Sequence, residues 1–184
     1  MNWWIIVIIV VIVLLVMWVI SAYNKLVRLK NRVEDQWAQI DVQLKRRFDL
    51  IPNLVETVKG YTKHESETLE SVINARNTYL AASTPEAQME ADGELTKAVS
   101  KLFALSEAYP DLKANENFVS LQNDLKDTED KIAASRQFYN DVVLKYNDQV
   151  ELFPGSIIAK LFNFKKEAYF KANDTERENV QVKF

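Results

Sequence analysis

The feature that most constrains this chain is an uninterrupted apolar run near its start. From Trp3 to Ile20 the sequence reads WWIIVIIVVIVLLVMWVI, without a charge, a glycine or a proline. As an α-helix this run rises about 27 Å, close to the roughly 30 Å hydrocarbon core of a bilayer. In lipid the backbone polar groups must be satisfied within the segment, so a helix is expected. Aromatic residues suited to membrane interfaces lie at its ends: Trp3, Trp4, Trp18 and Tyr23. We predict a transmembrane anchor over residues 1–22.

Two other readings of the run are a secretory signal peptide and a buried core helix. A signal peptide has a basic start, an apolar core of about 7 to 15 residues and a cleavage site with small residues. Here no Lys or Arg precedes the run, and only Ser21-Ala22 faintly resembles a cleavage site. We therefore expect an uncleaved, single-pass anchor.

The basic residues that follow the run predict its orientation. Four cations, here called the basic collar, come directly after the apolar residues: Lys25, Arg28, Lys30 and Arg32. The positive-inside rule places them on the cytoplasmic side of the cell membrane, with the N-terminus outside. The same cations could attract anionic lipid headgroups.

Composition favours helices for the rest of the chain. The 184 residues contain three glycines and four prolines, too few for the many turns of a stranded protein. The chain has no cysteine, which excludes disulfides and thiolate chemistry. Its net charge of −3 argues against nucleic acid as a partner. We predict an all-α protein.

Apolar residues recur at helical spacing in each segment between the prolines. The predicted helices run from the membrane through about residue 48, over 53–82, from Pro85 onward, and over 118–153. Thr84 should cap the third helix, with Pro85 in its first turn. We place a turn at Pro52, although a continuous helix stays open there. These helices predict an antiparallel, up-and-down four-helix bundle with coiled-coil-like periodicity over residues 23–153.

Residues 154–184 are predicted to form a short helix and an extended tail. If four antiparallel helices return the chain to the bilayer, the sequence FPGSIIAKLFNFKK lies near lipid. Its apolar residues form a candidate membrane-surface patch: Ile157, Ile158, Leu161, Phe162 and Phe164. The alternative, that they cap the open end of the bundle, carries at least equal weight. Val180, Val182 and Phe184 alternate and suggest an extended strap.

Three long phrases give the chain a family resemblance. They are IDVQLKRRFDLIPNLVETVKGYTKHE over 40–65, EAYPDLKANENF over 107–118 and TEDKIAASRQFYNDVVLKYN over 128–147, with FPGSIIA after them. The chain resembles the LemA family of bacterial membrane proteins over nearly its whole length. The resemblance implies one N-terminal membrane segment and an antiparallel helical bundle, and it transfers no catalytic residue or ligand. Some relatives reach the periplasm or carry a lipid-anchoring cysteine, and members are associated with envelope proteases or membrane remodelling, including magnetosome formation.

The sequence offers no catalytic, metal or cofactor site. His64 is the only histidine, and a zinc-binding HExxH helix would need a second one where Thr68 stands. A GxSxG elbow and a phosphate-binding glycine loop are absent as well. We expect a protein that is not an enzyme and uses no cofactor.

Several polar residues near the apolar stripes suggest a recognition surface. A candidate partner surface lies around the connection between the first two predicted helices: Lys45, Arg46, Arg47, Asn53 and Lys59. The alternative is that such residues are exposed charges or fix helix register, which we also consider for Asn140 and Asn147. We predict a scaffold or adaptor that presents a protein-binding surface at the cytoplasmic face. The alternative is a protein that organises the bilayer or assists a membrane protease. Expected partners are membrane lipid and an unidentified protein, with a homo-oligomer open.

Overall fold

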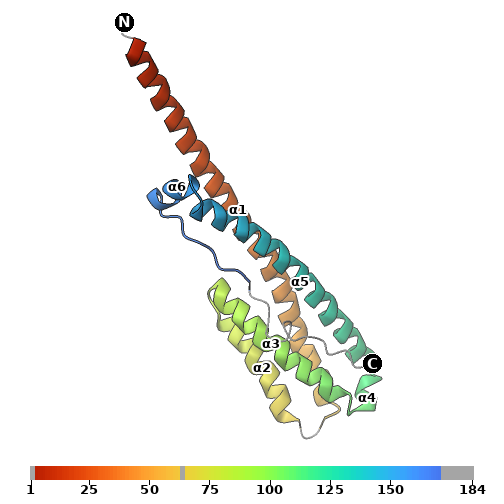
Figure 1. Cartoon of the computed structure of the whole chain (residues 1–184). Coiled ribbons are helices and arrows are strands. Elements are labelled where there is room, and N and C mark those ends of the chain that lie inside the picture. Colours follow the sequence, from red (N-terminus) through yellow and green to blue (C-terminus); the bar gives the residue numbers. More distant parts are fainter. Residues whose placement is uncertain (1–2, 63–64, 171–184) are drawn as a thin grey trace, which may run out of the picture. The chain divides into compact units, whose positions relative to one another are not determined.

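The structure is a computed structural model that describes residues 3–62 and 65–170, and every regular element in these ranges is a helix. The helices are coloured along the chain in Figure 1. Their bounds are α1 Trp3–Lys59, α2 Ser66–Ala81, α3 Pro85–Ser106, α4 Pro110–Lys113, α5 Glu116–Glu151 and α6 Gly155–Leu161. The all-α prediction is confirmed for the described chain. The arrangement as an up-and-down four-helix bundle and the domain limits at residues 22 and 153 stay predictions.

The described chain forms two compact units. Of the described residues, the first unit comprises 3–38 and 137–169, and the second comprises 39–62 and 65–136 together with Phe170. The long helices α1 and α5 therefore contribute residues to both units.

The predicted turn at Pro52 is wrong, because α1 continues through this proline to Lys59. Proline has no N–H to donate to the carbonyl four residues earlier, which is that of Phe48. In the structure Arg76 Nε of α2 donates to this oxygen at 3.2 Å. Burial of the apolar face around Pro52 also favours the helix, through residues less than 4% exposed: Ile51, Leu54, Val55 and Val58. The second predicted helix consequently begins at Ser66 rather than near residue 53.

The predicted start of the third helix is confirmed. Thr84 is the N-cap residue of α3, and its hydroxyl accepts a hydrogen bond from the Ala87 N–H at 3.2 Å. Pro85 stands in the first turn, where its missing N–H costs nothing, and Glu86 follows it.

The second unit is built on the stripes that the sequence predicts. The rings of Phe48 and Tyr79 stack with centroids 3.7 Å apart. The phenol of Tyr79 donates to Asp41 Oδ1 at 3.0 Å. Other apolar residues that recur at helical spacing along the sequence of this unit are also buried: Ile40, Leu44, Leu69, Val72, Leu95, Val99, Leu102, Phe118, Leu125 and Ile132.

In the first unit, the predicted stripes of α1 and α5 meet. The rings of Trp37 and Tyr139 pack edge to face with centroids 5.8 Å apart. Leu26 and Val33 of α1 and Tyr146 of α5 are buried. Phe153, which the sequence places at the end of the α5 stripe, is instead 81% exposed.

Candidate membrane-interface site

Helix α1 contains the one segment among the described residues that is long and apolar enough to cross a membrane. None of the residues in its apolar window is buried against another described part of the protein. The predicted anchor-end residues Trp3, Trp4, Trp18 and Tyr23 are all more than a third exposed. A helix of this kind needs an apolar surrounding, and lipid supplies one.

Helix α6 divides the candidate membrane-surface patch into an inner and an outer face. Ile158 is 1% exposed, so the expectation that it faces lipid is wrong, and Phe164 is half-buried. The outward residues include two that the sequence analysis missed. We call them the exposed apolar set: Leu152, Phe153, Ile157, Leu161 and Phe162.

Contacts with Tyr23 place α6 beside the end of the apolar run. The Tyr23 ring lies 4.7 Å from that of Phe162 and 5.8 Å from that of Phe164, measured between centroids. Tyr23 lies three residues beyond the apolar run, where an amphipathic ring favours a membrane interface. The exposed apolar set is therefore held at the level where the predicted span ends.

The C-terminal end of α6 explains how Phe164 reaches Tyr23. Asn163 takes a left-handed conformation with φ of 58°, which asparagine tolerates better than most residues. The Phe164 N–H donates to the Ala159 carbonyl at 2.9 Å, and the Asn163 N–H donates to that of Lys160 at 3.4 Å. This is a Schellman motif, which ends the helix and reverses the chain.

Beyond α6, the extended segment 164–169 is fastened to α5 by side chains that bind its backbone. The Asn147 amide donates to the Glu167 carbonyl at 2.9 Å and accepts from the Glu167 N–H at 3.0 Å. The phenols of Tyr146 and Tyr139 donate to the carbonyls of Lys165 and Ala168 at 2.8 and 3.1 Å. Burial, more than nearby carboxylates, raises the pKa of the Tyr146 phenol. Asn147 thus has a structural contact.

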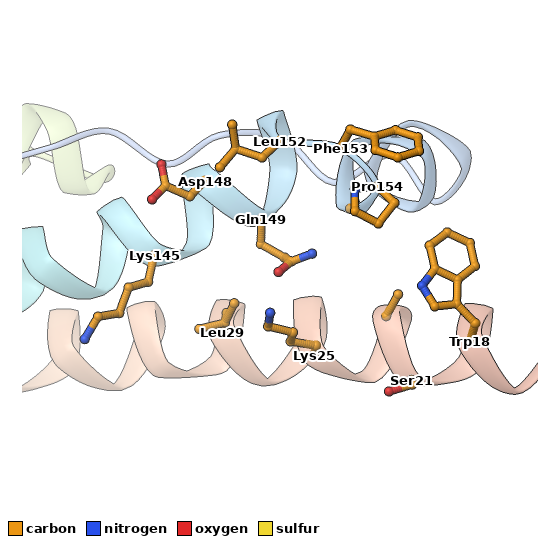
Figure 2. Close-up of a pocket in the computed structure, with 12 residues that line it drawn as sticks. Trp18, Ser21, Lys25, Leu29, Lys145, Asp148, Gln149, Leu152, Phe153 and Pro154 are labelled. Atoms are coloured by element: carbon orange, nitrogen blue, oxygen red, sulfur yellow. The ribbon is translucent and has the colours of Figure 1, made fainter.

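A cleft lies between α1 and the end of α5 in the first unit, with a volume of about 650 Å³. Figure 2 shows Lys25 reaching from α1 and Gln149 reaching from α5 into the same gap. Gly155 also lines it, and a Cβ there would overlap the Gln149 carbonyl oxygen. Glycine therefore allows the start of α6 to pack closely against α5. Of the basic collar, Lys25 alone lines this cleft.

The candidate partner surface loses one member, because Arg47 is buried with 2% exposure. Its guanidinium donates to Asp92 Oδ1 at 2.9 Å and to Thr96 Oγ1 at 3.0 Å, and Arg136 pairs with the other oxygen of Asp92. Glu129 lies 3.9 Å from Arg47. A carboxylate held between two guanidinium groups is suited to fixing helices rather than to proton transfer.

The remaining members of the candidate partner surface are exposed, including Lys45 and Arg46. Lys59 pairs with Glu56 at 2.9 Å. Asn53 lines a polar groove of about 460 Å³ that sequence reasoning missed, because its two sides come from α1 and α5. We call it the α1–α5 groove, and its lining residues are Asn53, Glu56, Thr57, Asn117, Ser120 and Leu121.

Metal-binding groups do not gather in the part of the chain that the structure describes. Within residues 3–62 and 65–170, no three His, Asp or Glu side chains lie close enough to hold a metal ion. His64 lies outside the described residues, as do Val180, Val182 and Phe184.

Comparison with known proteins finds one family and several relatives that match most of the chain. The LemA family model matches residues 36–184. Protein LemA of Metamycoplasma hominis is 24% identical over 164 residues, which cover 89% of this chain and 75% of that protein. Magnetosome protein MamQ 2 of Paramagnetospirillum magneticum is 23% identical, covering 85% of this chain and 68% of that protein. Magnetosome protein MamQ of Magnetospirillum gryphiswaldense is also 23% identical, covering 83% and 65%.

None of these names is the name of an enzyme. The family match spans the second unit, the C-terminal half of α5 and α6, and begins after the apolar run. The phrases over 40–65, 107–118 and 128–147 all lie inside it. The chain belongs to the LemA family.

Proposed function

We propose that the protein is a membrane-anchored, non-enzymatic scaffold that presents a protein-binding surface at the cytoplasmic face. The observation that carries this proposal is α1 itself. One helix, Trp3–Lys59, contains both the apolar membrane-spanning run and part of the core of the second unit. A tether and a folded unit that share a helix suit a protein that holds a partner near the bilayer.

The partner surface we assign is the α1–α5 groove together with the exposed cations Lys45 and Arg46. The groove is lined mainly by amide, hydroxyl and carboxylate groups, which suit hydrogen bonding to a protein partner. The hydrogen bond from Lys131 is the main cause that lowers the pKa of the Asp127 carboxyl, and the charge of Arg46 adds a smaller contribution in the same direction. Arg47 has no part in this surface.

Photocrosslinking in cells tests the partner surface. A photoreactive phenylalanine analogue is placed at Ser120, which lines the groove, and as a control at Glu70, which is exposed on α2. We expect a discrete protein adduct from Ser120 and none from Glu70. Equal adducts from both positions would remove the groove from the proposal.

Charge reversal gives a matched second test. Lys45→Glu with Arg46→Glu should abolish the Ser120 adduct, because it reverses the two cations that the proposed partner surface includes. Lys97→Glu with Lys101→Glu changes the net charge equally at other positions of the second unit and should preserve the adduct. Loss of the adduct in both variants would indicate a general charge effect and would contradict the assigned surface.

Cysteine labelling tests the cytoplasmic orientation. Because the chain has no native cysteine, an introduced thiol is the only one in the protein that can react. Leu80 is 59% exposed on α2, so Leu80→Cys presents one thiol on the second unit. A membrane-impermeant maleimide should label it only after the cells are permeabilised. Labelling of intact cells would place this unit outside.

A second candidate function is organisation of the bilayer through the exposed apolar set. Two observations favour it: the contact of Phe162 with Tyr23, and the 70% exposure of Leu161. An apolar helix face at the end of a membrane span gains free energy by entering the interface. The exposure of Leu161 leaves this face uncovered by other described residues.

Spin labelling of the full chain in liposomes tests this second function. A label at Leu161→Cys should collide more with oxygen than with a polar nickel reagent, as residues in lipid do. The same label at Leu80→Cys should show the reverse. If both labels favour the nickel reagent, α6 does not enter the membrane and only the scaffold proposal stands.

A further inference from the structure

The cleft between α1 and the end of α5 changes from apolar to basic along its length. Its apolar end is formed by Trp18, Phe153 and Pro154. Beyond it come Lys25, opposite the Gln149 amide, then Leu29 and then Lys145. Figure 2 shows Trp18 facing Phe153 and Pro154 at one end, and Lys25 below Gln149 further along α1. This order matches a molecule with an apolar part and an anionic head.

The position of this gradient along α1 matches the depth of a lipid headgroup. Trp18 lies within the apolar run, and Lys25 follows seven residues later, which is about 10 Å along a helix. The headgroup layer beyond the hydrocarbon core is roughly 5 to 8 Å thick. If Trp18 lies at the hydrocarbon boundary, the Lys25 ammonium group reaches the phosphate layer or lies just beyond it.

The charges in the cleft also favour an anion. Within the described ranges no carboxylate forms an ion pair with Lys25 or Lys145. Asp148 lines the cleft, but Figure 2 shows its carboxylate on the side of α5 away from α1. Figure 2 shows the Lys25 ammonium group pointing into the gap opposite Gln149, and Lys145 further along the cleft beyond Leu29, so two cations line the cleft at successive positions.

We propose that this cleft binds one anionic phospholipid, with its phosphate at Lys25 and with Lys145 as a second cation further along the cleft. Its acyl chains lie along Trp18 and Phe153, toward the hydrocarbon core. The volume of about 650 Å³ accommodates a headgroup, its glycerol and the first part of the chains. This inference rests on the membrane insertion of α1 in the proposed function, and it is independent of the protein partner.

Native mass spectrometry of the detergent-solubilised full chain tests the site. The protein is titrated with phosphatidylglycerol, which is anionic, and with phosphatidylcholine, which is zwitterionic. We expect one phosphatidylglycerol molecule to bind at least about tenfold more tightly, as two juxtamembrane cations near the surface permit. Lys25→Gln with Lys145→Gln should remove this preference.

The matched control is Arg28→Gln with Lys30→Gln, which removes two cations of the basic collar that do not line the cleft. This control should retain the preference, and circular dichroism should show the same helix content in all proteins. Equal loss in both double variants, or no loss in either, would overturn the site.

Inorganic phosphate separates a lipid site from a general phosphate site. At a concentration equal to that of the lipid, phosphate should leave the bound phosphatidylglycerol in place, because it lacks the acyl chains that contact Trp18. Full displacement by phosphate would overturn the assignment to lipid. If crosslinking from Ser120 succeeds but the protein does not prefer phosphatidylglycerol over phosphatidylcholine, the lipid site is rejected and the scaffold proposal stands. If the protein prefers phosphatidylglycerol but Ser120 gives no adduct, only the assigned partner surface is rejected.

Discussion

Arg76 should stabilise the second unit because it binds a carbonyl that Pro52 leaves without its helical donor. The structure pairs Arg76 Nε with the Phe48 oxygen at 3.2 Å, across 28 residues of sequence. The perturbation is Arg76→Met, which keeps most of the aliphatic stem of the side chain and removes the guanidinium. The companion change is Pro52→Ala, which supplies an N–H within reach of the same oxygen.

The expected magnitudes follow from general hydrogen-bond energies. A hydrogen bond that involves a charged group contributes about 1.5 to 3 kcal/mol, and the length and partial burial of this one place it near about 1.5 kcal/mol. In the Pro52→Ala background the helix satisfies the carbonyl itself, so Arg76→Met should cost only about 0.5 kcal/mol there. The expected coupling between the two positions is therefore about 1 kcal/mol, above the roughly 0.3 to 0.5 kcal/mol scatter of independent sites.

Hydrogen exchange of the full chain in detergent micelles is the appropriate assay, because it reports the second unit separately from the membrane span. The free energies of opening for core amides of α2 and α3 are compared in a double-mutant cycle of the wild type, both single variants and the double variant. A cost of Arg76→Met that is the same with proline and with alanine at residue 52 would refute the reasoning. Pro52→Ala alone should stabilise the unit, since proline inside a helix is unfavourable.

Three other substitutions test separate features of the fold. Asp92→Ala should destabilise the second unit by about 3 to 5 kcal/mol, because it removes the buried charge partner of Arg47 and leaves only the more distant and more exposed Glu129; a cost under 1 kcal/mol in hydrogen exchange would contradict this. Burial raises the pKa of the Tyr79 phenol above its usual value, and the hydrogen bond to Asp41 raises it further. The unfolded chain therefore ionises this phenol at a lower pH than the folded protein does. The contribution of Tyr79 to the free energy of unfolding is complete below pH 10 and declines as the pH rises above 10. Tyr79→Phe should therefore reduce the fall in stability between pH 10 and 11, in urea titrations at each pH, and an unchanged slope would exclude Tyr79 as its source. Asn163→Val should loosen the end of α6 by about 1 to 2 kcal/mol, whereas Asn163→Gly should not, and equal exchange rates in the two variants would contradict the conformational argument.

The sequence was sufficient for the elements whose signals are local. The cap at Thr84 and Pro85 depends on residues within one turn, and the structure confirms it. The stripe of α5 from Phe118 to Tyr146 depends only on spacing, and its main members are buried. The apolar run of α1 is equally local, since length and composition define it.

The features that the sequence did not predict depend on contacts between distant residues. The helix continues through Pro52 because Arg76 of α2 lies at the Phe48 carbonyl, which no local pattern indicates. From the sequence alone Arg47 is expected to be an exposed cation, because its buried partner Asp92 lies 45 residues away on α3. The basic cleft needs Lys25 and Lys145, which are 120 residues apart, and only their positions in space bring them together.

The binding of segment 164–169 through Asn147, Tyr146 and Tyr139 has a consequence for how this stretch can vary. All of these hydrogen bonds use main-chain atoms of the segment, so they do not depend on which side chains stand at residues 165, 167 and 168. Proline is excluded at Glu167, where the N–H is needed. Lys165 can therefore change, and with it the surface charge, without releasing the segment from its helix, whereas a change of Lys166 also removes its ion pair with Glu151 of α5.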